Sequence, residues 1–342
     1  AQDALVILVV NGRGAAPGEV HQNNAALWAQ LRDKTGTGTG ACAVGPFDSL
    51  DVLMIDRWSE GRYLPEKQGV GLARKIAGDV ALSLIESGHV SERWIRCTDA
   101  DVQVPPNYFE QLSSVDSGAA AAIHAFEHIP EGDAVQQDAM HAYDRYLQSY
   151  VDGLLAAGSP YAFHTIGSLI SVDAMSYAVV RGIPKRLAGE DFYLLNKLAK
   201  VGRIVSLDDQ AVRIRGRLSD RVPFGTGAAL TDICAVEHEQ APFQPYDPGL
   251  FEGLAHWLSA LRAFVVEPDI EELRDRVQLL AEPMGSALLS TLLEMNAFDA
   301  VEKASHQVSG THLHRRLMEW NDAFRTMKLI HGLRDKLLVL PS

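Results

Sequence analysis

The sequence predicts an α/β fold in which strands and helices alternate along the first half of the chain. Three short apolar runs, at residues 5–10, 52–55 and 94–97, are the first observation. Each run ends at a polar or glycine-containing stretch, so each is predicted to be a buried strand. Segments with helical spacing separate the runs, and this alternation favours a parallel, three-layer core.

Helical segments are predicted on either side of these strands. Residues 24–31 form the first, and residues 71–87 form the second because their apolar side chains recur at four-residue spacing. Two prolines, at 105 and 106, suit the first turn of a helix that runs to residue 112.

The middle of the chain continues to mix strands and helices. Strands are predicted at 119–126, 203–207 and 211–215, and helices at 138–155 and 191–200. Asp173 can cap a further helix that runs towards Val180.

A run of prolines marks a break near residue 245, and the pattern beyond it is helical. We therefore predict a domain boundary there, with an α/β domain at 1–245. A helical domain follows at 246–342. An apolar stripe between Leu313 and Met327 is interpreted as core, and a homodimer through the C-terminal helices is the alternative.

Composition narrows the classes of function. The 342 residues include 44 acidic and 31 basic side chains, for a net charge of −13, which disfavours nucleic acid and membrane surfaces as partners. A local basic cluster could still bind a phosphate. No apolar run reaches the ~18 residues of a membrane-spanning helix, so no integral membrane segment is expected. The three cysteines form no CxxC pair, and a reducing, cytoplasmic location is expected.

Polar side chains follow the predicted strands, where open α/β sheets bind ligands. Asn11 and Asp56 follow the first two strands, and Asp99 and Asp101 follow the third. In extended backbone the last two carboxylates would face the same way. At about 4 Å they would repel by roughly 4 kcal/mol at an effective dielectric of 20. A divalent cation such as Mn²⁺ or Mg²⁺ would relieve this repulsion, whereas the alternative is a solvated turn.

Three segments in this order resemble family 2 glycosyltransferases of the GT-A fold. Residues 94–109, Trp-Ile-Arg-Cys-Thr-Asp-Ala-Asp-Val-Gln-Val-Pro-Pro-Asn-Tyr-Phe, resemble that family's DxD region. Residues 69–79, which begin Gly-Val-Gly-Leu-Ala-Arg, resemble its glycine-containing helix start. Residues 189–202, which begin Gly-Glu-Asp, resemble its Gly-Glu-Asp motif. The resemblance covers roughly residues 3–230 and implies a GT-A-like three-layer fold with a C-terminal helical extension. It also implies that residues 1–245 form a catalytic domain, with a nucleotide-binding half at 1–115 and an acceptor half at 116–245.

The resemblance also implies roles for the donor side. Asp99 and Asp101, with Ala100 between them, would hold Mn²⁺ or Mg²⁺ on the donor diphosphate. Asp56 would contact the nucleotide base and Asn11 would lie near the nucleoside. A further residue, Arg74, would contact the base or the diphosphate. The first loop, Val-Val-Asn-Gly-Arg-Gly at 9–14, departs from the family's usual Pro-x-Tyr/Phe-Asn-Glu-like stretch.

On the acceptor side, Asp191 matches the catalytic base and Glu190 lies beside it. Such a base would deprotonate the acceptor hydroxyl as it attacks, which inverts the anomeric carbon. The alternative role for Asp191 is a helix N-cap. His164 and Gly167 could line the sugar pocket, while Arg217 and Arg221 could bind phosphate or an anionic acceptor, against the alternative of a solvated face. Three histidines, His164, His124 and His238, are candidates for a further metal ligand, against the alternative of ordinary packing or surface roles.

The implied function is transfer of a sugar from a UDP- or GDP-linked donor to a hydroxyl acceptor, with metal dependence and inversion. Two alternatives stay open. One is a metal-dependent phosphohydrolase, because an Asp-x-Asp triplet after a strand also occurs in phosphatases. The other is a non-catalytic nucleotide-sugar-binding or assembly protein.

Overall fold

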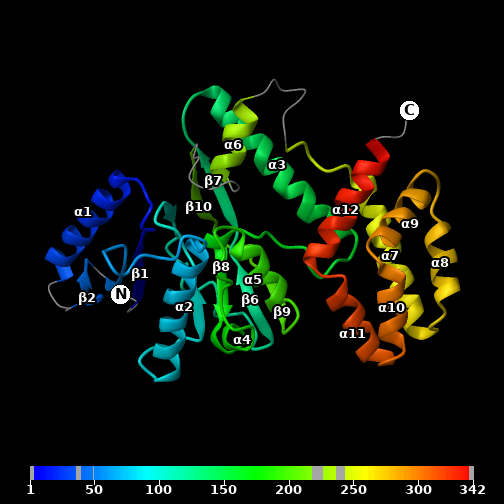
Figure 1. The fold of residues 1–342 in the computed structure, drawn as a ribbon, viewed down its shortest axis with the longest axis horizontal. Coiled ribbons are helices and arrows are strands. Elements are labelled where there is room, and N and C mark those ends of the chain that lie inside the picture. The colour runs from blue at the N-terminus through cyan, green and yellow to red at the C-terminus, as the bar shows by residue number, and fades with distance from the viewer. Residues whose placement is uncertain (1–3, 36–39, 49, 218–225, 236–242, 339–342) are drawn as a thin grey trace. The chain divides into compact units, whose positions relative to one another are not determined.

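The computed structural model describes residues 4–35, 40–48, 50–217, 226–235 and 243–338. Its contacts divide them into two compact units (Figure 1). The α/β unit holds described residues 4–127 and 165–214, and the helical unit holds 128–164, 215–217, 226–235 and 243–338. The predicted domain boundary near residue 245 therefore falls inside the second compact unit.

The first sheet has the order β1-β3-β2. Strands β1 (Leu5–Asn11) and β3 (Leu50–Arg57) form at the first two apolar runs, as predicted, and they pair in parallel. The edge strand β2 (Cys42–Phe47) pairs antiparallel with β3 and was not predicted. It contains Gly45 and Pro46, and an edge strand tolerates proline because one side of its backbone forms no ladder. Helix α1 (Gly18–Thr35) packs on this sheet.

The second sheet has the order β4-β8-β6-β9. Its strands are β4 (Trp94–Arg96), β6 (Ala119–Ile123), β8 (Ile170–Asp173) and β9 (Arg203–Ser206). Only the β6–β9 pair is parallel; β8 runs antiparallel to both of its neighbours. The fold is therefore mixed α/β, and the expectation of one parallel sheet is wrong. The reason is β8, a four-residue strand that the sequence analysis did not predict and that inserts between β4 and β6.

Two helices of the α/β unit pack closely on each other. Helix α2 (Val70–Glu86) meets α4 (Ala174–Val179) at Gly78, where an added Cβ would lie 2.5 Å from the Tyr177 hydroxyl oxygen. The predicted cap of α4 is confirmed, because the Asp173 carboxylate accepts a hydrogen bond from the Ser176 amide at 2.8 Å.

The predicted helix at 105–112 is wrong, because the segment forms consecutive turns. The Tyr108 amide bonds to the Pro105 carbonyl at 3.0 Å, and the Glu110 amide bonds to the Asn107 carbonyl at 2.9 Å. The Gln111 side chain donates at 2.8 Å to the Gln210 carbonyl, so side-chain bonds also hold this segment.

The third sheet has the order β5-β10-β7. Strand β5 (Val102–Gln103) pairs antiparallel with β10 (Val212–Gly216). Strand β7 (Phe126–Pro130) begins where the predicted strand at 119–126 ends, so that prediction spans two strands in different sheets.

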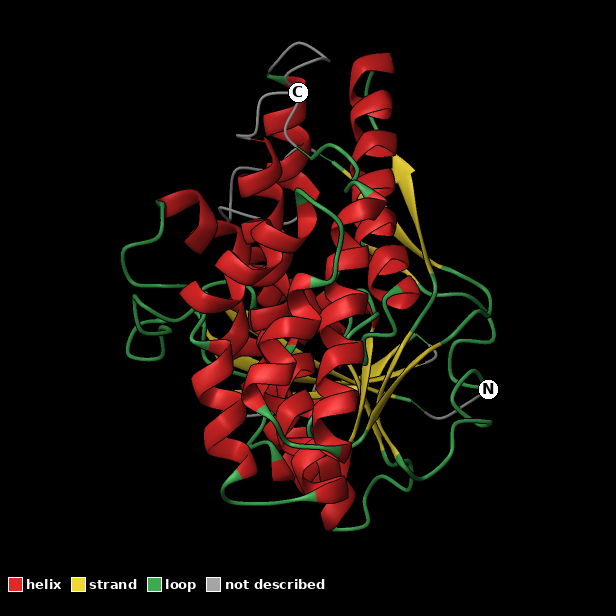
Figure 2. Cartoon of the chain, turned by 90° about the vertical axis from the view of Figure 1, so that its right-hand side faces the viewer, coloured by secondary structure: helices red, strands yellow, loops and turns green. Residues whose placement is uncertain are grey.

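Helices make up most of the helical unit (Figure 2, red). They are α3 (Ala134–Ala156), α6 (Thr226–Cys234), α7 (Pro248–Val266), α8 (Ile270–Gln278), α9 (Met284–Glu294), α10 (Ala297–Ser305), α11 (Gly310–Trp320) and α12 (Ala323–Leu338). Among the residues described, no helix combines the length and the apolar character needed to cross a bilayer.

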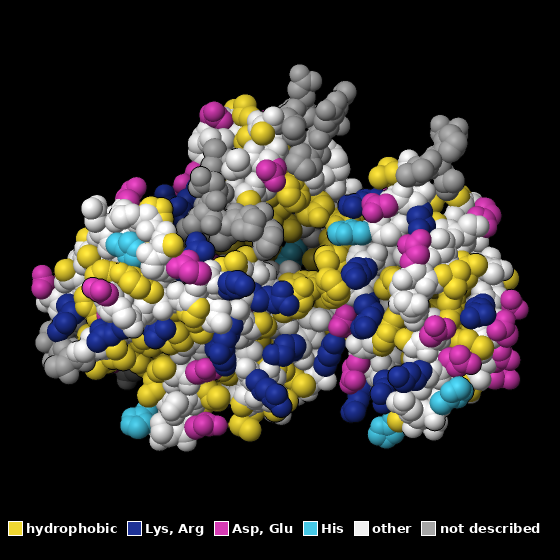
Figure 3. Space-filling model, viewed as in Figure 1, with side chains coloured by type: hydrophobic (Ala, Val, Ile, Leu, Met, Phe, Trp, Pro, Cys, Tyr) yellow, Lys and Arg dark blue, Asp and Glu magenta, His cyan; other side chains and the backbone are white. Residues whose placement is uncertain are grey.

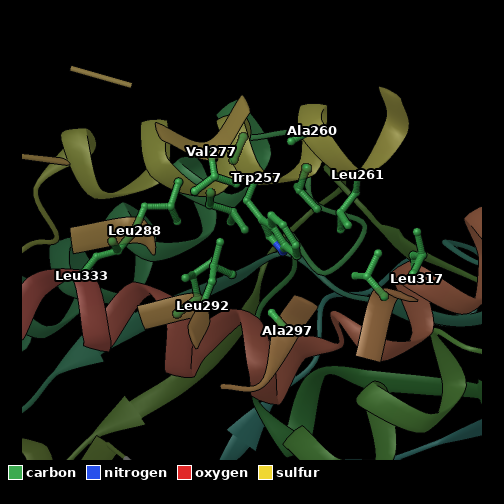
Figure 4. Close-up of a cluster of buried hydrophobic side chains, with 14 of the residues drawn as sticks. Trp257, Ala260, Leu261, Val277, Leu288, Leu292, Ala297, Leu317 and Leu333 are labelled. Carbon is green, nitrogen blue, oxygen red and sulfur yellow. The ribbon is translucent and has the colours of Figure 1, made fainter. Parts of the chain in front are cut away.

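The core of the helical unit surrounds Trp257 (Figure 4). This indole is fully buried among leucines of several helices, and its Nε1 donates to the Asn321 Oδ1 at 3.1 Å. Leu313 and Leu317 are also buried in this core, which confirms the core interpretation for these two members of the late apolar stripe.

Candidate active site

Arg74 links two of the sequence motifs that lie far apart along the chain. Its Nη2 is 2.5 Å from the Asp99 Oδ1, and its Nη1 is 2.5 Å from the Glu190 Oε1. Glu190 is buried, whereas the Asp99 side chain is 44% exposed. Burial lowers the pKa of Arg74, but the two carboxylates raise it more, so the guanidinium stays charged. The glycine-containing helix start, the DxD segment and the Gly-Glu-Asp motif thus meet at one side chain.

Two glycines at the start of α2 explain how Arg74 reaches this position. The amides of Gly69 and Gly71 both donate to the Arg186 carbonyl, at 3.3 and 3.2 Å. A Cβ on Gly71 would overlap the Pro184 carbonyl oxygen and lie 2.8 Å from the Arg186 backbone. Only glycine therefore allows the segment at 184–187, which leads into the Gly-Glu-Asp motif, to lie against the helix start.

Gly167 lies beside the Arg74 guanidinium. It begins a short 3₁₀ turn (Gly167–Leu169) before β8. A Cβ at this position would overlap the guanidinium nitrogen atoms, so the missing side chain makes room for Arg74. The sequence analysis assigned Gly167 to the acceptor side and gave no signal for this packing role.

Asp191 is not the cap of its helix. Helix α5 (Glu190–Leu198) has Gly189 as its N-cap, with a left-handed φ of 72° that favours glycine. The Asp191 Oδ1 accepts a hydrogen bond from the Phe192 amide at 2.7 Å. Burial and the neighbouring Glu190 charge raise the pKa of Asp191, smaller effects that include Arg74 lower it, and the net pKa is about 6. This carboxylate is ionised at neutral pH and is a stronger base than an exposed aspartate.

Cys97 lies within the electrostatic reach of Arg74, Asp99 and Glu190, a position that the sequence analysis did not consider. Burial raises the pKa of the Cys97 thiol to about 11, although Arg74 lowers it in part. The thiol is therefore protonated at neutral pH, so it is not an activated nucleophile.

The DxD segment forms a turn, which corrects the expectation of extended backbone. Strand β4 ends at Arg96, and the Val102 amide bonds to the Asp99 carbonyl at 3.3 Å to close a turn with Ala100 and Asp101 at its centre. The chain must turn here because it leaves the sheet of β4 and enters the sheet of β5. The alternation of side chains along a strand therefore does not apply to these carboxylates.

The donor set at this turn fits a hard divalent cation. Mg²⁺ is commonly bound by one or two carboxylates together with phosphate oxygens of a substrate. Asp99 and Asp101 supply two such carboxylates within this one turn. Within the described ranges there is no group of three or more His, Cys, Asp or Glu residues that could hold a metal ion by itself.

Asn11 and Asp56 lie at the ends of the paired strands β1 and β3. The parallel register places Val10 opposite Asp56 and Asn11 opposite Arg57. The Asp56 carboxylate is buried and accepts hydrogen bonds from the Trp58 amide, the Ser59 amide and hydroxyl, and the Arg62 Nη1, at 2.6–3.0 Å. Burial raises the pKa of Asp56, but these donors lower it more, so the net shift is downward. The observed bonds hold the turn after β3 in place.

His124 has other partners than Arg74. His124 is buried, and its ring nitrogens lie 2.6 Å from the Gln111 Oε1 and 2.8 Å from the Ser171 Oγ. Burial lowers its pKa to about 4, and both nitrogens are engaged in the core. His164 and Arg217 belong to the helical unit. Two candidates, Arg221 and His238, lie outside the described residues.

Comparison of the chain with models of known protein families finds no matching family, and comparison with curated proteins finds no similar sequence.

Proposed function

We propose that this chain is a metal-dependent, inverting glycosyltransferase that resembles GT-A enzymes of family 2. The donor is a UDP- or GDP-linked sugar and the acceptor carries a hydroxyl group. The observation that carries this proposal is the contact of Arg74 with both Asp99 and Glu190. One guanidinium joins a candidate donor-binding turn to the start of a helix that carries a candidate base.

The donor side is the turn at Asp99 and Asp101. Its carboxylates would hold Mn²⁺ or Mg²⁺ against the donor diphosphate, and that ion would supply positive charge to the leaving group. Arg74 adds a fixed cation beside the same turn. Arg74 also bonds to Glu190, so its guanidinium would fix the position of the turn relative to the start of α5.

The acceptor side is the start of α5. Asp191 would take the proton of the acceptor hydroxyl while that oxygen attacks the anomeric carbon from the face opposite the leaving group. A pKa of about 6 suits this role, because the group is ionised at neutral pH and still holds a proton better than an exposed aspartate. Glu190 would act through Arg74 as its buried counter-ion.

A transfer assay tests the proposal. The full chain is incubated with Mn²⁺, a set of UDP-, GDP- and TDP-sugars and a panel of hydroxyl acceptors, and the anomeric configuration of the product is read by NMR. We expect one donor to be consumed with inversion, and Asp191→Asn to abolish turnover. Glu86→Gln, at the exposed far end of α2, is the matched control and should leave turnover unchanged.

Other outcomes would favour the alternative functions. Release of inorganic phosphate without sugar transfer would indicate a phosphohydrolase. Donor binding without turnover under every condition would indicate a binding protein. Either result would overturn the proposed transferase activity.

A further inference from the structure

A surface formed by α4 and the segment after it combines basic and apolar side chains. Its members, called here the cationic–apolar surface, are Met175, Val179, Arg181, Lys185, Arg186 and Leu187. Lys and Arg side chains gather over α2, α4 and α5 in the lower centre of Figure 3. In a chain with a net charge of −13, this local excess of positive charge is unusual.

The basic side chains of this surface are not neutralised by carboxylates. Arg181, Lys185 and Arg186 are exposed, and none of them forms an ion pair with a described acidic side chain. Of the neighbouring cations, Lys75 pairs with Asp79 at 2.9 Å. Burial lowers the pKa of Lys197, and the positive charges of Lys75 and Arg181 lower it further. Arg181, Lys185 and Arg186 thus add positive charge that no described carboxylate pairs with.

The apolar members are large and face solvent. Met175 is 67% exposed, Val179 is 63% exposed, and the two lie one helical turn apart on α4. Leu187 is 47% exposed at the other end of the surface. Other exposed apolar side chains occur elsewhere, and what sets these three apart is that they lie in the same stretch of chain as Arg181, Lys185 and Arg186.

The backbone beneath the surface is held by specific bonds. Asp173 caps α4, and the Arg186 carbonyl accepts the amides of Gly69 and Gly71. The Arg186 guanidinium stacks on the Tyr193 ring at 3.6 Å from its centroid. The backbone that carries these basic and apolar side chains is therefore held in place by hydrogen bonds.

We propose that the cationic–apolar surface docks onto an anionic lipid bilayer. Peripheral proteins bind such surfaces by inserting apolar side chains at the headgroup level while Lys and Arg contact anionic headgroups. A nucleic acid would match the basic residues but would leave the exposed Met175 and Val179 without a role. The net negative charge of the whole chain disfavours membrane surfaces as partners, but the side chains of this local surface carry positive charge. This proposal does not depend on the proposed sugar transfer.

Vesicle co-sedimentation of the full chain tests the proposal. We expect binding to phosphatidylcholine vesicles that contain phosphatidylserine, weaker binding to phosphatidylcholine alone, and loss of binding at high salt. The Arg181→Gln/Lys185→Gln variant should bind on the order of 20-fold more weakly, since each basic side chain near an anionic surface contributes about fivefold. The Met175→Ser/Val179→Ser variant should also bind more weakly.

Matched controls lie in the helical unit. Arg315→Gln/Arg316→Gln removes two exposed cations of α11, and Val266→Ser/Leu279→Ser removes two exposed apolar side chains. Both should bind vesicles as the unchanged chain does, with all variants checked for folding by circular dichroism. Equal binding by the cationic–apolar variants and the controls would overturn the proposal. Binding to duplex DNA rather than vesicles would also overturn it and assign the basic residues to a polyanion.

Discussion

Arg74 is the counter-ion of Glu190, whose side chain is only 3% exposed. Removing one partner of a buried ion pair leaves the other without compensation. We predict that Arg74→Met lowers the free energy of unfolding by about 3–5 kcal/mol, measured by urea denaturation. The neighbouring Lys75→Met should cost at most about 1 kcal/mol, because its partner Asp79 is half exposed.

A double variant separates the ion pair from simple packing. Arg74→Met/Glu190→Gln should be more stable than the sum of the two single changes predicts, because no buried charge is left unpaired. If the effects of the two single changes simply add, the ion pair does not stabilise the fold and Arg74 acts only through its packing.

Asp191 should couple stability and activity to pH in opposite directions. Its pKa is raised from 3.8 to about 6, so the folded chain holds this proton more tightly than the unfolded chain. Stability from this group is therefore present below pH 4 and is lost as the pH rises through 6. We predict that Asp191→Asn raises the free energy of unfolding by about 1–3 kcal/mol at pH 8, and that the gain shrinks towards pH 4.

Turnover should follow the ionised form of the same carboxylate. The kcat of the unchanged chain should rise with pH, reach half of its maximum near pH 6 and level off at higher pH. A flat profile between pH 5 and 8 would remove the base role. A stability gain of Asp191→Asn over the unchanged chain that is no larger at pH 8 than at pH 4 would contradict the raised pKa.

The sequence predicted which residues belong to the site but not how they contact one another. Arg74, Asp99 and Glu190 were all singled out from motifs, and the structure brings them together. Their mutual contact was not predictable, because Asp99 lies 25 residues and Glu190 lies 116 residues from Arg74 along the chain. The packing role of Gly167 was also hidden, since it depends on the path of a side chain from a different helix.

At the scale of elements, the fit of α2 against the 184–187 segment is the critical contact. Gly71→Ala would force a Cβ into the Pro184 carbonyl oxygen, so we predict a loss of about 1–3 kcal/mol in unfolding free energy. Gly18→Ala, at the start of α1, would meet no atom within 4 Å and should cost far less. Thermal denaturation of the two variants checks this difference; equal melting temperatures would contradict the close packing.

Long elements with a clear period were predictable, and short ones were not. The apolar run of β1 and the four-residue spacing of α2 appear in the structure at nearly the predicted bounds. Strand β2 was hidden by its internal Gly-Pro, and β8 has only four residues, two of them polar. The predicted helix at 105–112 depended on two prolines that suit a turn equally well.

For the whole molecule, mixed α/β architecture followed by helices was predictable from the alternation of patterns. The arrangement of the sheets was not, because the sequence does not reveal that β8 pairs antiparallel between β4 and β6. The compact units also divide differently from the predicted domains. Helix α3 packs against α6 and α7, and such contacts between distant segments leave no local pattern in the sequence.

Calorimetric titration of nucleotide sugars in the presence of Mn²⁺ tests the central claim most directly. We predict that one UDP- or GDP-sugar binds only when Mn²⁺ is present, that Asp99→Asn/Asp101→Asn abolishes this binding, and that Asp191→Asn retains it. If no nucleotide sugar binds, or if binding survives the loss of both turn carboxylates, the account of this site is contradicted.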